Sequence, residues 1–290
     1  MDENNLTPNF PSQEAPQQLP LTDVNIENIE QTSNQYLLRH PFYIILPAGA
    51  LLLIILLSIF LKSYYPLYLI LFILFLVSLF YTEFKNRHQQ EFMKQFAAQN
   101  NFTYNSNGYF DDPNVSLFKL GSDKYITNLI SGNYKNCPFS LYNYQYTIRS
   151  GKHSMTYYYT IFSLHFHTTT PAFLLESKKQ QIGHALFDTH TTDNYLQLEG
   201  NFNDYFSLSM PKGYERDVLQ ILTPDVMAKL IDEAKYFSME IINDHLYLYA
   251  KKTISTKQDL YAFYELAQYF IEKLAPILRQ MKPTLDAKIM

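Results

Sequence analysis

Residues 141–167 read LYNYQYTIRSGKHSMTYYYTIFSLHFH, and the expected fold of the chain rests on this stretch. Two kinds of side chain alternate through it, beginning with Tyr142, Tyr144 and Tyr146 on one face. A period of two places successive side chains on opposite faces of a β-strand. The centre of the stretch, RSGKHS at 149–154, is rich in turn-forming residues. We therefore expect a long β-hairpin.

Shorter runs with strand character lie on both sides of this hairpin. They are 125–130, 172–176, 195–199, 205–210, 239–242 and 246–250. The last two flank Asn243-Asp244-His245, which predicts a tight turn between two paired strands. Short connections of this kind are typical of an antiparallel sheet.

Two helices are expected near the C-terminus. Thr223-Pro224-Asp225 predicts a helix start, with Thr223 as the N-cap and Pro224 in the first turn. Residues 257–281 repeat apolar residues at spacings of three and four, which is typical of an amphipathic helix. The predicted fold class is therefore α+β, with a mostly antiparallel sheet and packed helices that include this long C-terminal amphipathic helix.

Two uncharged apolar runs precede the alternating region. The run at 41–61 reads PFYIILPAGALLLIILLSIFL, and as a helix it would span about 31 Å, close to the hydrocarbon thickness of a bilayer. The run at 67–81, LYLILFILFLVSLFY, reaches a spanning length when the two preceding tyrosines are included. We predict a transmembrane helical hairpin over 35–81, with spans at 41–61 and 64–81. A hydrophobic hairpin buried in a soluble core is the alternative.

Basic residues flank the two runs unequally. Arg39 precedes the first run, and Lys85, Arg87 and Lys94 follow the second. The loop between the runs holds only Lys62. Because cytoplasmic flanks carry the excess of Lys and Arg, we predict a cell-membrane protein with two spans and with both termini in the cytoplasm.

The remaining segments complete the predicted domain organisation. Residues 1–34 are rich in Asn, Gln, Pro and Glu and predict a disordered tail. Residues 82–99 predict a stem helix, and residues 100–290 predict one soluble α+β domain. The stem helix has an apolar stripe that is expected to dock on this domain. The stripe consists of Phe84, Phe92, Phe96 and Ala97.

The paired apolar runs and three later motifs also carry a resemblance. The motifs are FSLSM at 206–210, ILTP at 221–224 and IINDHLYL at 241–248. With these features the chain resembles a family of uncharacterised bacterial membrane proteins that is known only as a domain of unknown function. The resemblance implies two N-terminal transmembrane helices and a cytosolic α+β domain. It implies no activity and no active-site residues.

Composition and motifs exclude several classes of function. The formal net charge is −4, so the chain lacks the basic character that nucleic-acid binding needs. Cys137 is the only cysteine, which rules out an intramolecular disulfide. The sequence contains no Walker loop and no GxGxxG, GxSxG, HExxH or paired CxxC motif. We therefore expect no cofactor and assign no catalytic residue.

Two histidines are the candidate metal ligands. His165 and His167 lie two residues apart, on one face of the second strand of the expected hairpin. Two imidazoles at this spacing can share one ion if further ligands join them. The nearest candidates in sequence are His184, Asp188 and His190. The alternative is a partly exposed strand face that binds no metal.

Aromatic and thiol groups have both structural and functional interpretations. Tyr142, Tyr144 and Tyr146 are expected to form core, and an aromatic binding platform is the alternative. Cys137 lies in strand-like sequence and is expected to be a buried small side chain, with a cysteine nucleophile as the alternative.

Two charged groups likewise have both a structural and a functional interpretation. Asp111-Asp112 precedes a proline and is expected to form a solvated turn, with an ion site as the alternative. Arg149, Lys152 and His153 belong to the turn of the predicted hairpin. They are expected to be solvated, and contact with anionic lipid headgroups is the alternative.

The sequence favours a membrane-tethered cytosolic module that binds another protein or a second copy of itself, with the lipid bilayer as its other partner. An enzyme acting on a membrane-associated substrate is the first alternative, and a subunit of an oligomeric membrane complex is the second. A deep polar pocket with converging titratable groups would favour the enzyme, whereas a filled core would favour the binding module.

Overall fold

The computed structural model describes residues 66–108, 114–134, 137–166, 171–180, 194–198, 200–254 and 256–280, with the single residues 41, 42, 45, 48, 49 and 52. The predicted tail at 1–34 lies outside the described residues. So does the predicted first span at 41–61, apart from those six positions.

The described strands form one nine-stranded sheet with the order β1-β2-β3-β4-β9-β8-β5-β7-β6. Each of the pairings in the described part of the sheet is antiparallel, which confirms the predicted α+β class. The strands are β1 (Thr103–Asn107), β2 (Ser122–Tyr134), β3 (Cys137–Ser150), β4 (His153–His165), β5 (Phe173–Ser177), β6 (Asn194–Leu196), β7 (Phe206–Met210), β8 (Ser238–Ile242) and β9 (His245–Ala250).

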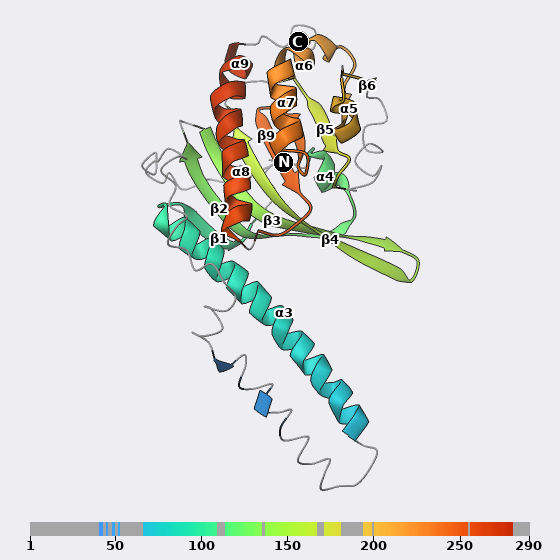
Figure 1. The fold of residues 1–290 in the computed structure, drawn as a ribbon, viewed down its shortest axis with the longest axis vertical. Helices are drawn as coiled ribbons and strands as arrows, with labels where there is room; N and C mark the ends of the chain where they lie inside the picture. The colour runs from blue at the N-terminus through green and yellow to red at the C-terminus, as the bar shows by residue number, and fades with distance from the viewer. Residues whose placement is uncertain are drawn as a thin grey trace, which may run out of the picture.

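The hairpin of β3 and β4 is longer than its alternating pattern indicated. Its register runs from Phe139 opposite Leu164 to Ser150 opposite His153, so that only Gly151 and Lys152 form the turn. Gly151 has a φ of +59°, a conformation that glycine adopts without steric cost. The far end of this hairpin projects beyond the neighbouring strands, and α3 extends below the domain in the same view (Figure 1).

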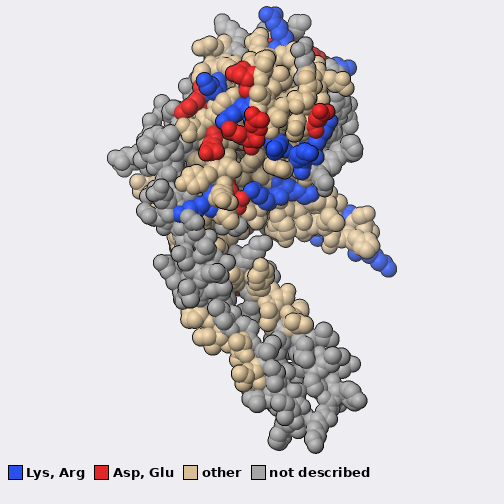
Figure 2. Space-filling view, viewed as in Figure 1, with Lys and Arg blue, Asp and Glu red and all other residues tan. Residues whose placement is uncertain are grey.

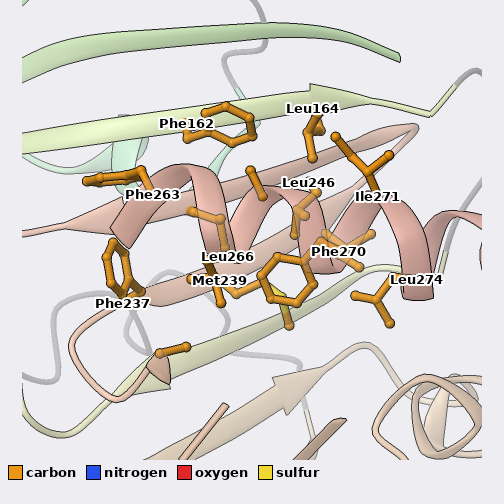
Figure 3. Close-up of a cluster of buried hydrophobic side chains, with 14 of the residues drawn as sticks. Phe162, Leu164, Phe237, Met239, Leu246, Phe263, Leu266, Phe270, Ile271 and Leu274 are labelled. Carbon is orange, nitrogen blue, oxygen red and sulfur yellow. The ribbon is translucent and has the colours of Figure 1, made fainter. Parts of the chain in front are cut away.

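Helices cover one face of the sheet, where the larger part of the core lies (Figure 1). The close-up in Figure 3 shows Phe263, Leu266 and Phe270 of this helical layer turned toward strand residues such as Phe162 and Leu246. The described helices are α3 (Pro66–Gln99), α4 (Ser116–Lys119), α5 (Phe202–Tyr205), α6 (Glu215–Ile221), α7 (Pro224–Glu233), α8 (Lys257–Tyr269), η3 (Phe270–Leu274) and α9 (Ala275–Gln280).

The predicted C-terminal amphipathic helix is interrupted. It begins at the N-cap Thr256, whose hydroxyl oxygen accepts a hydrogen bond from the Asp259 amide at 3.2 Å. It continues as α8 and α9 with the π-helical turn η3 between them. A π-turn adds one residue to the helical repeat, which shifts the apolar stripe around the helix axis. Phe270, Ile271 and Leu274 all remain buried across this turn.

α3 joins residues of the predicted second span and of the predicted stem in one continuous helix of 34 residues. Its C-terminal half is docked on the helical side of the core, as the stem stripe predicted, and Phe92, Phe96 and Ala97 are buried there. In its N-terminal half the described side chains of Phe72, Phe75 and other large apolar residues are exposed. Among the described residues, no helix has the length and apolarity that a membrane crossing needs.

Candidate functional site

A pocket of about 860 Å³ lies between α3 and the sheet. This volume is in the range of sites that enclose a small molecule. One wall is the segment 81–90 of α3, the floor is formed by β2, β3 and β4, and the third side is the segment 251–253 that follows β9. The lining residues are Tyr81, Asn86, Gln89, Gln90, Thr127, Asn128, Asn143, Tyr144, Gln145, Thr156, Tyr157, Tyr158, Lys251, Lys252 and Thr253.

Amide, hydroxyl and phenol groups dominate this lining. Among the described residues that line the pocket there is no carboxylate, histidine or cysteine. The lining can donate and accept hydrogen bonds at many points, and the exposed rings of Tyr81 and Tyr158 offer flat apolar surface. It does not contain the acid and base pair that proton-transfer catalysis usually employs. The pocket is therefore equipped to bind a ligand.

Asn143 is the buried polar residue at the floor of the pocket. Its side chain is only 5% exposed, and its Nδ2 atom has no hydrogen-bond partner in the described part of the chain. The other end of the amide, Oδ1, lies 3.3 Å from the Thr160 hydroxyl. Exchanging the amide oxygen and nitrogen would leave the oxygen unpartnered in place of the nitrogen. A buried amide end without a partner costs about 1–3 kcal/mol.

The wall at 251–253 is held by a set of buried hydrogen bonds. The Thr160 hydroxyl donates to the carbonyl oxygen of Lys252 at 2.7 Å and accepts from the amide of Ile254 at 3.1 Å. Gln89 of α3 donates through Nε2 to the carbonyl oxygen of Ile254 at 2.7 Å. These bonds tie β4, the segment after β9 and α3 together, so the three sides of the pocket have a fixed spacing.

A bulge in β2 supplies another polar group. The pairing of β2 with β3 shifts its register between Thr127 and Ile130, and Asn128 has a φ of +55° at this point. Asparagine tolerates this left-handed conformation better than most residues. The Tyr104 phenol donates to Asn128 Oδ1 at 2.8 Å. The bulge thereby turns Asn128 into the pocket lining.

The two lysines of the pocket have different surroundings. The Lys252 ammonium lies 2.5 Å from an Asp259 carboxylate oxygen at the start of α8. The Lys251 ammonium lies 5.5 Å from the centre of the Tyr157 ring, within cation–π range. The Tyr157 ring in turn stacks on Tyr146, so both lysine side chains have partners.

The tyrosine row of β3 is core, and the alternative of an aromatic platform is wrong. Tyr142, Tyr144 and Tyr146 are each only 1% exposed. They lie on the face of the sheet opposite the main helical layer, in a second buried cluster that includes Tyr159 and Tyr247. Stacking on an incoming base or ring is therefore impossible for these three side chains.

A buried carboxyl group joins this second cluster to α4. Glu240 of β8 accepts hydrogen bonds from the backbone amide of Ser116 at 3.0 Å, from the Ser116 hydroxyl at 2.7 Å and from the Tyr249 phenol. Burial raises its pKa from 4.5 to about 6, although these donors favour the ionised form. The bonds hold α4 against the sheet, which is a structural role.

The structure places His165 beside two partners that the sequence interpretation did not join to it. His165 Nε2 lies 2.6 Å from Asp244 Oδ2, and His245 Nδ1 lies 2.6 Å from Asp244 Oδ1. His167 and the other three candidate ligands, 184, 188 and 190, lie outside the described residues. The predicted pair of His165 and His167 therefore stays a prediction, and His165 lies in a cluster with Asp244 and His245.

The other candidate residues from the sequence lie in the core, at the hairpin turn or outside the described residues. Cys137 is completely buried in the main core, so the nucleophile alternative is wrong for this side chain. Asp111-Asp112 lies outside the described residues. At the hairpin turn, Arg149 is paired with Asp123 at 2.5 Å, and Lys152 and His153 are exposed. Lys and Arg side chains gather at the tip of the projecting hairpin in Figure 2.

Known proteins give little further information. No family model and no curated protein matches the chain. Among solved structures, the crystal structure of the mycobacterial trehalose monomycolate transport factor A, TtfA, matches with 11% sequence identity and a TM-score of 0.46. The match covers 69% of this chain and 97% of that chain. A likeness at this level carries no argument about function.

Proposed function

We propose that this chain is a membrane-anchored protein whose cytosolic α+β domain is a binding module, and that the pocket between α3 and the sheet holds its ligand. The observation that carries the proposal is the pocket itself, which has a volume of about 860 Å³ and is lined mainly by amide, hydroxyl and phenol groups. Concave sites of this size with several converging polar groups are the usual places where proteins bind small molecules.

The anchoring part of the proposal rests on the sequence runs 41–61 and 64–81, which are long and uncharged apart from Lys62 outside them. Large apolar side chains such as Phe72 and Phe75 are exposed along α3, where they do not contribute to the core of the domain. A lipid environment would remove them from water. The pocket begins at Tyr81, the last residue of the proposed second span.

The position and lining of the pocket limit the chemistry of its ligand. Neutral amides and hydroxyl groups, with the adjacent Lys251 and Lys252, suit a neutral or anionic molecule with several hydrogen-bonding groups. Without a described carboxylate in the lining, the pocket has nothing to neutralise a cation. The proposed ligand is therefore a polar molecule, or the polar part of a membrane component, with hydroxyl or anionic groups.

A pocket-filling substitution tests this proposal. Thr156 lines the pocket and is exposed, so Thr156→Trp would occupy the pocket without disturbing the core. The full chain is purified in a mild detergent, and native mass spectrometry with extraction of small molecules measures what remains bound. We expect a molecule bound to the wild type and at least a tenfold lower occupancy in Thr156→Trp.

Ser154→Trp is the matched control, because Ser154 lies two residues away on the same exposed side of β4 and does not line the pocket. Its occupancy should equal that of the wild type. The pocket assignment is refuted if no molecule is bound to the wild type, or if both tryptophan variants retain it equally. Extraction of the chain from membranes at alkaline pH would contradict the anchoring part of the proposal.

A further inference from the structure

Three metal-ligating side chains meet at one end of the central strands β4, β9 and β8. His165 ends β4, His245 begins β9, and Asp244 belongs to the two-residue turn between β8 and β9. The ligand atoms of the three residues all lie within 4.8 Å of one another. None of the three lines the pocket between α3 and the sheet. The cluster is thus separate from the site of the proposed function.

The backbone fixes these three positions closely. His165 and His245 are direct register partners where β4 pairs with β9. Asn243 has a φ of +55°, which closes the turn that carries Asp244. The amide of Phe166 donates to the carbonyl oxygen of Asp244 at 2.8 Å and pins the turn to the end of β4. A ligand set carried by two paired strands and a pinned turn is largely preorganised.

The ligand types select a class of ion. Two imidazoles and one carboxylate suit divalent first-row transition ions, whereas magnesium and calcium prefer oxygen ligands alone. The side chains of His165, Asp244 and His245 are 29%, 37% and 24% exposed. An ion can therefore reach the cluster from solvent, and water can fill its remaining coordination positions.

Coordination of one ion by both imidazoles requires a change in side-chain torsion. The imidazole rings of His165 and His245 are inclined by only 3°, with centroids 4.5 Å apart. Parallel rings cannot both direct an in-plane lone pair at one point. Rotation of one ring about its Cβ–Cγ bond brings the lone pairs together, and this torsion has a broad, low-cost profile.

From this geometry we infer that His165, Asp244 and His245 form a binding site for one divalent first-row transition ion, with the ion held by two imidazole nitrogens and one carboxylate and completed by water. The convergence of the three side chains carries the inference. Its ligand set differs from that of the sequence hypothesis, since it keeps His165 and adds Asp244 from the turn between β8 and β9 and His245 from the start of β9.

Zinc binding to the full chain tests the site. The chain is purified in detergent with a tag that contains no histidine, treated with a chelator and titrated with zinc in a calorimeter. We expect one equivalent of zinc to bind to the wild type. His245→Gln and Asp244→Asn should each weaken binding at least tenfold, since each removes one ligand. His153→Gln, on the exposed hairpin turn, should leave binding unchanged.

Cobalt supplies a spectroscopic readout of the ligand set. One equivalent of Co²⁺ should give visible absorption bands in the wild type and in His153→Gln, and circular dichroism verifies that each variant is folded. Folded variants of His245 and Asp244 should lack these bands. Less than a tenth of an equivalent of zinc on the wild type overturns the inference. So does unchanged zinc affinity in folded His245→Gln and Asp244→Asn.

Discussion

Glu176 and Glu240 are buried carboxyl groups on the tyrosine-bearing face of the sheet. Glu240 has donors from Ser116 and Tyr249, and its pKa rises only to about 6. Burial alone raises the pKa of Glu176 from 4.5 to about 8. Between pH 4.5 and pH 8 the native domain holds Glu176 protonated, whereas the unfolded chain ionises it.

This difference predicts a pH dependence of stability. From pH 4.5 to pH 8 the native state binds more protons at Glu176 than the unfolded state, so the free energy of unfolding falls as pH rises. The loss is on the order of 3–5 kcal/mol over this window. Urea denaturation followed by circular dichroism at pH 5 and pH 8 measures it. Glu176→Gln should be markedly less sensitive to pH, and identical pH slopes would refute the assignment.

A substitution of Asn143 distinguishes the effect of this residue on stability from its effect on ligand binding. Asn143→Leu keeps the size of the side chain and removes the unpartnered amide end. We expect the empty domain to become more stable by about 1 kcal/mol, since a buried unsatisfied group is lost. The same variant should lose its bound molecule in native mass spectrometry. A less stable variant with full occupancy would show that the amide serves the fold alone.

At the scale of elements, α3 has two different halves. Phe96 is fully buried and lies against Tyr264 and Phe102, with ring centroids 5.4 Å and 5.9 Å away. Phe75 is 58% exposed. The C-terminal half is thus part of the core of the domain, and it carries the wall of the pocket with it.

The two halves predict different mutational costs. Phe96→Ala should lower the free energy of unfolding of the domain by about 3–5 kcal/mol, because it leaves a cavity in the core. Phe75→Ala is the control on the same helix, and its effect should stay within about 0.5 kcal/mol. Denaturation of both variants in the same detergent gives the comparison. Similar effects for the two variants would mean that α3 is not docked as described.

At the scale of the whole molecule, the proposed orientation places the domain in the cytoplasm. The basic flanks Arg39, Lys85, Arg87 and Lys94 support it against the single Lys62 of the loop. A protease added to inverted membrane vesicles should digest the domain, whereas right-side-out vesicles should protect it until detergent is added. Digestion from the outside of intact right-side-out vesicles would contradict this orientation.

Local patterns predicted the elements whose neighbours are close in sequence. The alternation at 141–167 predicted the hairpin of β3 and β4, and the spacing at 257–281 predicted the C-terminal helix apart from its π-turn. Both depend on periodicity that a single segment contains. The strand β1 at 103–107 escaped prediction because its burial pattern is almost entirely exposed, so it lacks the alternation that marks a half-buried strand.

The sites depend on contacts that no local pattern reveals. β4 pairs with β9, far along the chain, and this register brings His245 beside His165. The sequence predicts His245 in the turn, but the turn is only Asn243 and Asp244, and His245 is the first residue of β9. The pocket likewise joins α3, three strands and the segment after β9, so its polar lining has no signature in sequence.

Photocrosslinking in intact membranes tests the central claim, that the pocket beside α3 holds a ligand. A photoreactive amino acid is placed at Thr156 inside the pocket or at Ser154 outside it, and the irradiated chain is weighed by mass spectrometry. We expect a discrete small-molecule adduct from position 156 that is missing from position 154. The absence of any adduct at 156, or the same adduct at both positions, would contradict it.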